Sequence, residues 1–510
     1  MRRLTLSLSI VLSMVAAIAL AADGNNPPWY PSLMASEAYD SGRSRLFEEA
    51  NFTGSFNRPN VVDVLTSPED VYLTPYNVVY RNADSMFVYG GGYGDQGGKG
   101  AFVAKVDSTT LEKIWFTQLI HIDTGPPPPP GTPWDYPGVV GLLKDGLLYV
   151  IYGNQLTKLD PRDGRVVLST QLPTNTNGLY PPGDTAYNGF VALPDGTIIA
   201  KTVYRRLGCS EQGFSAFLKC SNPELVPNSI LVAIDPEHLT KLDQIEIPAF
   251  TVGRVTSSRF GGTDYIYVPG PKFVYRFIFA NGRFTQDTQW GPVQYNDDGS
   301  GQTPASALVV MNDWVVFTTN GATVQQACLS ASPPCTSPWL TVWAINQADS
   351  SKQFKRQPFA NMFPPPTTPG PPPVSYPLSF APSAPTVDPL RNRIFVFDAG
   401  PGKLAALDLE PNGWQVTWMV GQRTTEFMAL IGPRNRRVLV TTQIPEGEPL
   451  QTNSINYVVW REAEGGRQLA ISDQLEPILS GTMVEPGYAG RMYYLGKSGE
   501  IKKLTVRPAP

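Results

Sequence analysis

The stretch KLDPRDGRVVLSTQL, residues 158–172, places a polar turn between two short apolar strings. Asp160 and Gly164 suit such a turn, because an aspartate can accept hydrogen bonds from the backbone just after it and glycine tolerates a positive φ. A looser copy, AKVDSTTLEKIWFTQL, lies at 104–119. The recurrence of strand, polar turn and strand predicts a chain built from repeated β-hairpins.

Eight such units follow one another, and nearly every unit is preceded by one more short apolar string such as GVVGLLKDG (138–146). The units span residues 86–119, 147–172, 197–247, 265–290, 314–354, 394–418, 438–471 and 492–506. Four strands per unit at fairly even spacing predict an all-β fold, an eight-bladed β-propeller with four-stranded antiparallel blades around a central channel. A seven-bladed ring is the alternative.

The eighth unit ends after its third strand, and a ring left open there would expose a bare sheet edge. We therefore expect VVDVLT (61–66) to supply the missing strand and close the ring. The predicted organisation is a signal peptide at 1–21, an N-terminal extension at 22–60 and a propeller domain at 61–510.

The first residues predict export. Arg2 and Arg3 precede an apolar run from Leu4 towards Leu20, and a small-residue cleavage pattern ends near Ala21. These features are typical of a cleaved secretory signal peptide, and no other segment is long and apolar enough to span a bilayer. We expect a mature protein that is secreted or periplasmic.

The four cysteines fall into two close pairs, Cys209 with Cys220 and Cys328 with Cys335. In an oxidising compartment an even cysteine count favours disulfides, and we expect each pair to bridge one loop. A zinc site is the alternative, but neither pair has C-x₂-C spacing.

The composition argues against nucleic-acid binding. The formal net charge is −4, and no basic run interleaved with aromatic residues occurs. A protein that follows a phosphate backbone would need such a run. Proline-rich stretches at 125–133 and 363–377 belong in surface loops, which leave a protein partner open as a possibility.

Polar residues just ahead of each innermost strand would gather at the mouth of the channel. The candidate catalytic carboxylates are Glu426, Glu485 and Asp184. The candidate ligand-binding residues are Arg423, Thr424, Tyr187, Asn188, Arg254, Thr303 and Ser306.

The segment GQRTTEF (421–427) stands out because it places a cation and an anion at one strand start. Arg423 suits a carboxylate or sulfate, and Glu426 would serve as a base if buried. The alternative is that both residues join neighbouring blades by hydrogen bonds.

Asn296, Asp297 and Asp298 offer oxygen ligands of the kind that calcium accepts, although a solvated turn is the simpler interpretation. We therefore assign no metal site.

The repeated phrase apolar-x-Asp-x-x-(Thr/Asp)-Gly resembles the blade repeat of pyrroloquinoline-quinone-type proteins. Its best copies are KLDPRDGRVV (158–167), AKVDSTTLEKIW (104–115), AIDPEHLTKL (233–242) and ALDLEPNGWQVTW (406–418). The resemblance implies a propeller, and it makes pyrroloquinoline quinone and calcium the cofactors to consider. The adjacent cysteine pair of the quinoprotein alcohol dehydrogenases is absent from the sequence.

Three functional hypotheses follow. The first is a small organic or carbohydrate ligand bound at the central funnel. The second is an enzyme, either a quinone-dependent dehydrogenase or a cofactor-free lyase, hydrolase or isomerase that uses funnel carboxylates. The third is a protein-interaction scaffold. The sequence does not decide between enzyme and binding protein.

Overall fold

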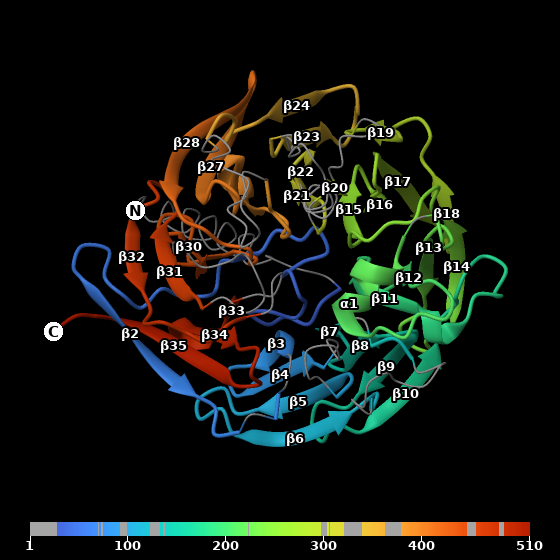
Figure 1. Ribbon diagram of the computed structural model, residues 1–510, viewed down its shortest axis with the longest axis horizontal. Coiled ribbons are helices and arrows are strands. Elements are labelled where there is room, and N and C mark those ends of the chain that lie inside the picture. Colours follow the sequence, from blue (N-terminus) through green and yellow to red (C-terminus); the bar gives the residue numbers. More distant parts are fainter. Residues whose placement is uncertain are drawn as a thin grey trace, which may run out of the picture.

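The computed structural model describes residues 28–69, 71–72, 75–91, 99–122, 133–135, 138–222, 224–296, 303–304, 306–320, 339–362, 379–445, 455–478 and 484–510. Their strands form eight sheets that stand around a common axis (Figure 1). This arrangement confirms the predicted eight-bladed propeller and excludes the seven-bladed alternative. The ring contains almost no helix, and among the described residues no helix has the length and apolarity to cross a membrane.

Each sheet runs from an innermost strand near the axis to an outermost strand at the rim, and its strands follow in that order (Figure 1). The first four sheets are β3 (Pro75–Asn82), β4 (Ser85–Gly90), β5 (Phe102–Val106) and β6 (Lys113–Gln118); β7 (Val139–Leu142), β8 (Leu148–Tyr152), β9 (Gln155–Leu159) and β10 (Val166–Gln171); β11 (Thr185–Ala192), β12 (Ile198–Tyr204), β13 (Ile230–Ile234) and β14 (Lys241–Glu246); and β15 (Thr256–Phe260), β16 (Thr263–Pro269), β17 (Phe273–Ala280) and β18 (Arg283–Gln286), with β19 (Val293–Gln294) also on β17.

The other four sheets complete the ring. They are β20 (Thr303–Pro304) and β21 (Val309–Met311), both on β22 (Trp314–Asn320), then β23 (Val342–Asn346) and β24 (Gln353–Arg356); β25 (Thr386–Asp388), β26 (Arg393–Asp398), β27 (Lys403–Glu410) and β28 (Gly413–Gly421); β29 (Ala429–Ile431), β30 (Val438–Gln443), β31 (Tyr457–Glu462) and β32 (Gln468–Ile471); and β33 (Val484–Pro486), β34 (Arg491–Leu495), β35 (Ile501–Pro508) and β2 (Asn60–Thr66).

The turn between β9 and β10 shows why the repeat carries its aspartate and glycine. The Asp160 carboxylate accepts the backbone N–H of Arg162 at 2.9 Å, and Gly164 takes a φ of 74° while its N–H donates to the Asp160 carbonyl. Asp107 accepts two backbone N–H groups in the matching turn of the first sheet. The repeated aspartate is therefore a turn former rather than a catalytic signature.

The core lies between neighbouring sheets. One continuous apolar cluster joins Val79 and Phe87 of the first sheet to Leu148 and Ile151 of the second. Every residue of β8 is buried, whereas the outermost strand β10 is mostly exposed. Stacking the sheets face to face removes this apolar surface from water, which is the main force holding the ring together.

The outermost strand of the eighth sheet comes from the N-terminal part of the chain, as we expected from the incomplete eighth unit. β2 pairs antiparallel with β35, in a register that runs from Asn60 opposite Pro508 to Thr66 opposite Lys502. The ring is thus closed by strands from the two ends of the described chain.

Strand direction defines two faces of the ring. Because neighbouring strands are antiparallel, the links between second and third strands share one face with the links from each sheet to the next. We call this the loop face, and it carries the long links, such as 205–229 and 357–385. The opposite side, the turn face, carries short turns, of which 107–112 and 432–437 are among the longest.

Residues 28–56, which we call the N-terminal segment, enter the ring, and residues 34–45 lie along the innermost strands in the central channel, which we call the bore (Figure 1). Its backbone bonds to innermost strands of six sheets. The pairs are Met34 with Tyr80, Ala35 with Leu142, Ser41 with Ser257, Gly42 with Val310, Ser44 with Val387 and Arg45 with Leu430. Two of its residues form β1 (Leu46–Phe47), which runs parallel to β29. The bore is therefore occupied by the chain's own N-terminal residues.

Candidate functional site

The predicted ligand-binding residue Asn188, together with other polar residues of the innermost strands and their links, joins one sheet to the next. The Asn188 side chain donates to the Val252 carbonyl at 2.5 Å, in the link leading to the fourth sheet. Asn77 makes the same kind of contact twice, since its amide bonds both the N–H and the carbonyl of Val140. Thr256, Ser383 and Thr386 bind backbone carbonyls of the following sheet in the same way.

Tyr187 and Thr424 lie in the core rather than at an open mouth. Both are fully buried; the Tyr187 hydroxyl donates to the Pro173 carbonyl at 2.6 Å, and the Thr424 hydroxyl lies 2.8 Å from that of Thr442. Ser306 contributes its backbone, accepting the N–H of Arg254 at 2.7 Å. Thr303 is placed in the two-residue strand β20. Tyr187 and Thr424 therefore make structural hydrogen bonds within the ring.

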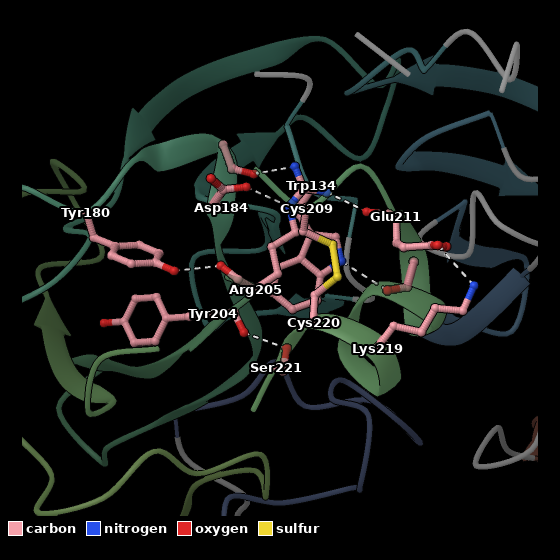
Figure 2. The surroundings of a disulfide bond; sticks show 12 residues. Trp134, Tyr180, Asp184, Tyr204, Arg205, Cys209, Glu211, Lys219, Cys220 and Ser221 are labelled. Carbon is pink, nitrogen blue, oxygen red and sulfur yellow. Dashed lines mark hydrogen bonds and ion pairs between the residues drawn. A yellow bond between two sulfur atoms is a disulfide. The ribbon is translucent and has the colours of Figure 1, made fainter. Parts of the chain in front are cut away.

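Asp184 belongs to a separate structure on the loop face of the third sheet. Its carboxylate accepts the Nε–H of Arg205 at 2.8 Å, and the same guanidinium donates to the carbonyls of Gly183 and Glu211 (Figure 2). Because Asp184 precedes the third sheet and Glu426 precedes the seventh, the two carboxylates stand on opposite sides of the eight-membered ring. They do not form one catalytic pair.

The Arg205 contacts anchor an insert between β12 and β13. The insert contains α1 (Gly213–Cys220) and the disulfide between Cys209 and Cys220, as predicted, with an S–S distance of 2.09 Å (Figure 2). The Asp135 carboxylate accepts the N–H of Gly213 at 2.7 Å, and the Trp134 indole donates to the carbonyl of the same glycine. Closing a loop of this length by a disulfide contributes about 3 kcal/mol in the chain-entropy view. We call residues 205–229 the stapled insert.

Glu426 and Arg423 lie on the link to the seventh sheet. Glu426 is only 1% exposed, and its Oε1 accepts the Thr425 hydroxyl at 2.6 Å. Arg423 is half-buried, with its carbonyl bonded to the N–H of Ile444. Their role as a ligand-binding pair stays a prediction.

A group of buried charges surrounds Glu37 of the N-terminal segment. Arg254 donates to Glu37 Oε1, which also accepts the Tyr76 hydroxyl at 2.9 Å, and Arg43 donates to Oε2 at 3.1 Å. A second Arg254 nitrogen lies 2.5 Å from the Tyr76 oxygen. Burial lowers the pKa of Arg254 to about 9 and that of Arg43 to about 10, because water no longer solvates the cations.

Arg45 and Glu485 form a neighbouring group. The Arg45 guanidinium lies 3.5 Å from the centre of the Phe427 ring, and burial lowers its pKa to about 9. Burial also raises the pKa of Glu485 well above its ordinary value, against the opposing effect of the Arg45 charge. Glu485 Oε1 has no hydrogen-bond partner within the described part of the chain. Of the three predicted catalytic carboxylates, Glu485 thus lies beside the N-terminal segment.

Sequence reasoning missed Glu37, Arg43 and Arg45. They lie in SEAYDSGRSR (36–45), whose charges and lack of strand periodicity are typical of a solvated linker. No local signal distinguishes such a linker from a segment buried inside a ring, because the partners of these residues lie far away in the sequence.

The described residues contain no group of carboxylates that fits the calcium ion of a calcium–quinone cofactor. Calcium needs six to eight oxygen ligands. Among the described residues, no three His, Cys, Asp or Glu side chains converge. Asn296 donates from its side chain to the Pro271 carbonyl at 3.1 Å. We therefore assign no chemical step to such a cofactor.

Several sequence predictions lie outside the described residues. They are the signal peptide at 1–21, the pair Cys328 and Cys335, and the side chains of Thr303, Asp297 and Asp298.

No protein-family model and no curated protein matches the sequence. Among solved structures, the quinohemoprotein alcohol dehydrogenase from Comamonas testosteroni is similar at 12% identity and a TM-score of 0.52, over 93% of this chain and 77% of that one. BamB from Moraxella catarrhalis is similar at 9% identity and a TM-score of 0.47, over 87% of this chain and 98% of that one. At such identities the likeness concerns the propeller fold alone.

Proposed function

We propose that this chain is an exported binding module that contacts a protein partner with its loop face, through the stapled insert and the adjoining link 172–184. One observation carries this proposal. The three most exposed large hydrophobic side chains of the described residues are Leu179 at 81%, Leu207 at 61% and Leu225 at 57%, and all three lie on these two links.

The two links are held against each other. The Tyr180 hydroxyl donates to the Arg205 carbonyl at 2.6 Å, and its ring packs edge-on against Tyr204 with centroids 5.0 Å apart. In sequence, Leu179 directly precedes Tyr180, and Leu207 follows Arg205 by two residues, so both adjoin this anchored contact along the chain. The base of the insert is fixed further by a backbone bond from Arg206 to Cys220.

A rigid apolar surface favours binding. A fixed loop loses less conformational freedom on association than a loose one, so more of the contact energy appears as affinity. Burying a leucine side chain contributes about 2 kcal/mol. A disulfide that persists in the mature protein also agrees with export into an oxidising compartment.

The test places a photo-crosslinking amino acid at position 207 of the mature protein in the organism that produces it. We expect a discrete adduct with one protein, and we expect Leu179→Ser with Leu225→Ser to reduce it at least fivefold while the melting temperature stays within about 3 °C. The matched control carries the probe at exposed Leu242 on the outer strand β14. The proposal is contradicted if the adduct yield is the same with the probe at 207 and at 242, or if the serine substitutions leave the yield at 207 unchanged.

A small organic or carbohydrate ligand at the mouth of the bore is the second candidate. It is favoured by Arg423 and Glu426, which place a cation and a buried carboxylate on one short link of the loop face. We expect organic acids or sugars that bind there to raise the melting temperature of the wild type, and Arg423→Ala with Glu426→Gln to remove that rise. A rise that survives the double substitution would place the ligand elsewhere. The enzymatic alternatives have no comparable observation in their favour; of the predicted carboxylates, Asp184 stands across the ring from Glu426.

A further inference from the structure

The Glu37 carboxylate is bound as a ligand would be. It receives two guanidinium donors and a phenol, and all four residues are at least nine-tenths buried, with exposures of 4% for Glu37, 8% for Arg254, 3% for Tyr76 and 3% for Arg43. Charge-assisted bonds of this kind are roughly twice as strong as neutral ones.

The site is divided between the ring and the N-terminal segment. Arg254 precedes the fourth sheet and Tyr76 lies in β3 of the first, whereas Glu37 and Arg43 belong to the segment. The ring therefore contributes a guanidinium and a phenol hydroxyl, which together form a receptor for one carboxylate. Arg43 also donates to the Val255 carbonyl at 2.8 Å, which joins the segment to the ring a second time.

Backbone bonds to six sheets and buried apolar side chains also hold the segment, and part of its backbone is strained. Its only regular strand is the two-residue β1. Three of its non-glycine residues have a positive φ, Tyr39 at 76°, Arg43 at 61° and Arg45 at 57°. Such conformations are costly for side chains other than glycine and persist only where surrounding contacts enforce them. The hydrogen bond from Arg43 to the Glu37 carboxylate is one such contact.

We propose that Arg254 and Tyr76 form a carboxylate-binding site inside the ring, that Glu37 of the chain's own N-terminal segment is its resident ligand, and that an acidic peptide carrying the same carboxylate fills the bore in trans. This inference is independent of the loop-face function, because the proposed site uses no residue of the stapled insert or of link 172–184.

The first experiment makes the segment exchangeable in the full-length folded protein. Residues 57–59 are exposed and join the segment to β2, so a specific protease site placed there is cut after folding. Labelled peptide 28–56 is then added, and its incorporation is followed by fluorescence anisotropy. We expect the cut segment to stay bound through gel filtration and to exchange with the labelled peptide over hours.

Two competitor peptides decide whether the carboxylate is responsible. Glu37→Gln should compete at least tenfold less well than the natural peptide. Glu49→Gln, which removes the same charge at an exposed position of the segment, should compete equally well. Equal competition by the two variants, or no exchange under conditions where the ring stays folded, would overturn the proposal.

A second measurement uses the uncut protein. In Glu37→Ala, sodium acetate should raise the melting temperature by at least 3 °C and in a saturable way, compared with sodium chloride at the same ionic strength. The double variant Glu37→Ala with Arg254→Gln should not respond. If Glu37→Ala does not fold, the peptide-exchange experiment with the cut protein remains the test of the proposal. If Glu37→Ala folds and acetate does not raise its melting temperature, the proposed site is contradicted.

Discussion

A chain that begins at Ser67 is expected to lose its cooperative unfolding transition. The deletion removes β2, which leaves β35 as a bare edge strand, and it removes the segment that occupies the bore. It also removes buried Trp29, Met34 and Phe47. Truncating one large buried side chain costs about 3–5 kcal/mol, whereas a whole domain is stable by about 5–15 kcal/mol, so their combined loss exceeds what the ring can tolerate.

Differential scanning calorimetry of the shortened chain, beside the chain that lacks only the predicted signal peptide, tests this expectation. A third chain that lacks residues 28–56 but keeps β2 separates ring closure from filling of the bore. We expect this third chain to melt at least 10 °C below the reference and to aggregate less than the chain without β2. A transition of unchanged midpoint after removal of residues 28–66 would show that neither contact stabilises the ring.

The second large effect concerns Lys201 of β12, a fully buried lysine that forms no salt bridge within the described part of the chain. Its ammonium group donates to the carbonyls of Thr251 at 2.6 Å and Thr202 at 3.2 Å. Burial alone lowers the pKa of Lys201 from 10.5 to about 7. The folded protein therefore releases a proton near neutrality that the unfolded chain keeps until about pH 10.5.

The direction of the pH dependence follows from this difference. Between pH 7 and 10.5 the unfolded state binds more protons than the folded state, so this lysine makes stability rise with pH across that window. Below pH 7 the cost of burying the charge is present in full. We expect the free energy of unfolding of the wild type, relative to Lys201→Met, to increase by about 2–3 kcal/mol between pH 6 and pH 9.

Urea denaturation of both proteins at pH 6, 7.5 and 9 measures this change. The Lys201→Met substitution also removes two hydrogen bonds. Because their loss lowers the free energy of unfolding by the same amount at every pH, it does not change the pH trend. Lys201→Leu should give the same trend, which controls for side-chain shape. Lys201 does not titrate in this window if the difference in free energy of unfolding between wild type and variants stays constant with pH, or if the variants become relatively more stable as pH rises.

The candidate site was only partly predictable. Glu426 and Arg423 were chosen as candidates because the sequence itself shows a charged pair just ahead of a predicted strand. Asp184 was identified by the same rule, yet its partner Arg205 makes it an anchor of the stapled insert. Position ahead of a strand is known from the sequence, but the direction and partner of a side chain are not.

The repeat itself determined the sheets. Apolar strings with period two, separated by Asp- and Gly-containing turns, contain the information for each hairpin within about 30 residues, so the number of blades was predictable. Ring closure was predictable because the eighth unit lacks a strand, and the Cys209–Cys220 bridge because the two cysteines are close in sequence. Only the tertiary structure decided that residues 28–56 fill the bore. Arg254 and Glu37 are 217 residues apart, and their pairing exists only once eight sheets have closed around the segment. Local sequence patterns determine strands and turns, whereas the pairing of buried charges depends on how all eight sheets are arranged.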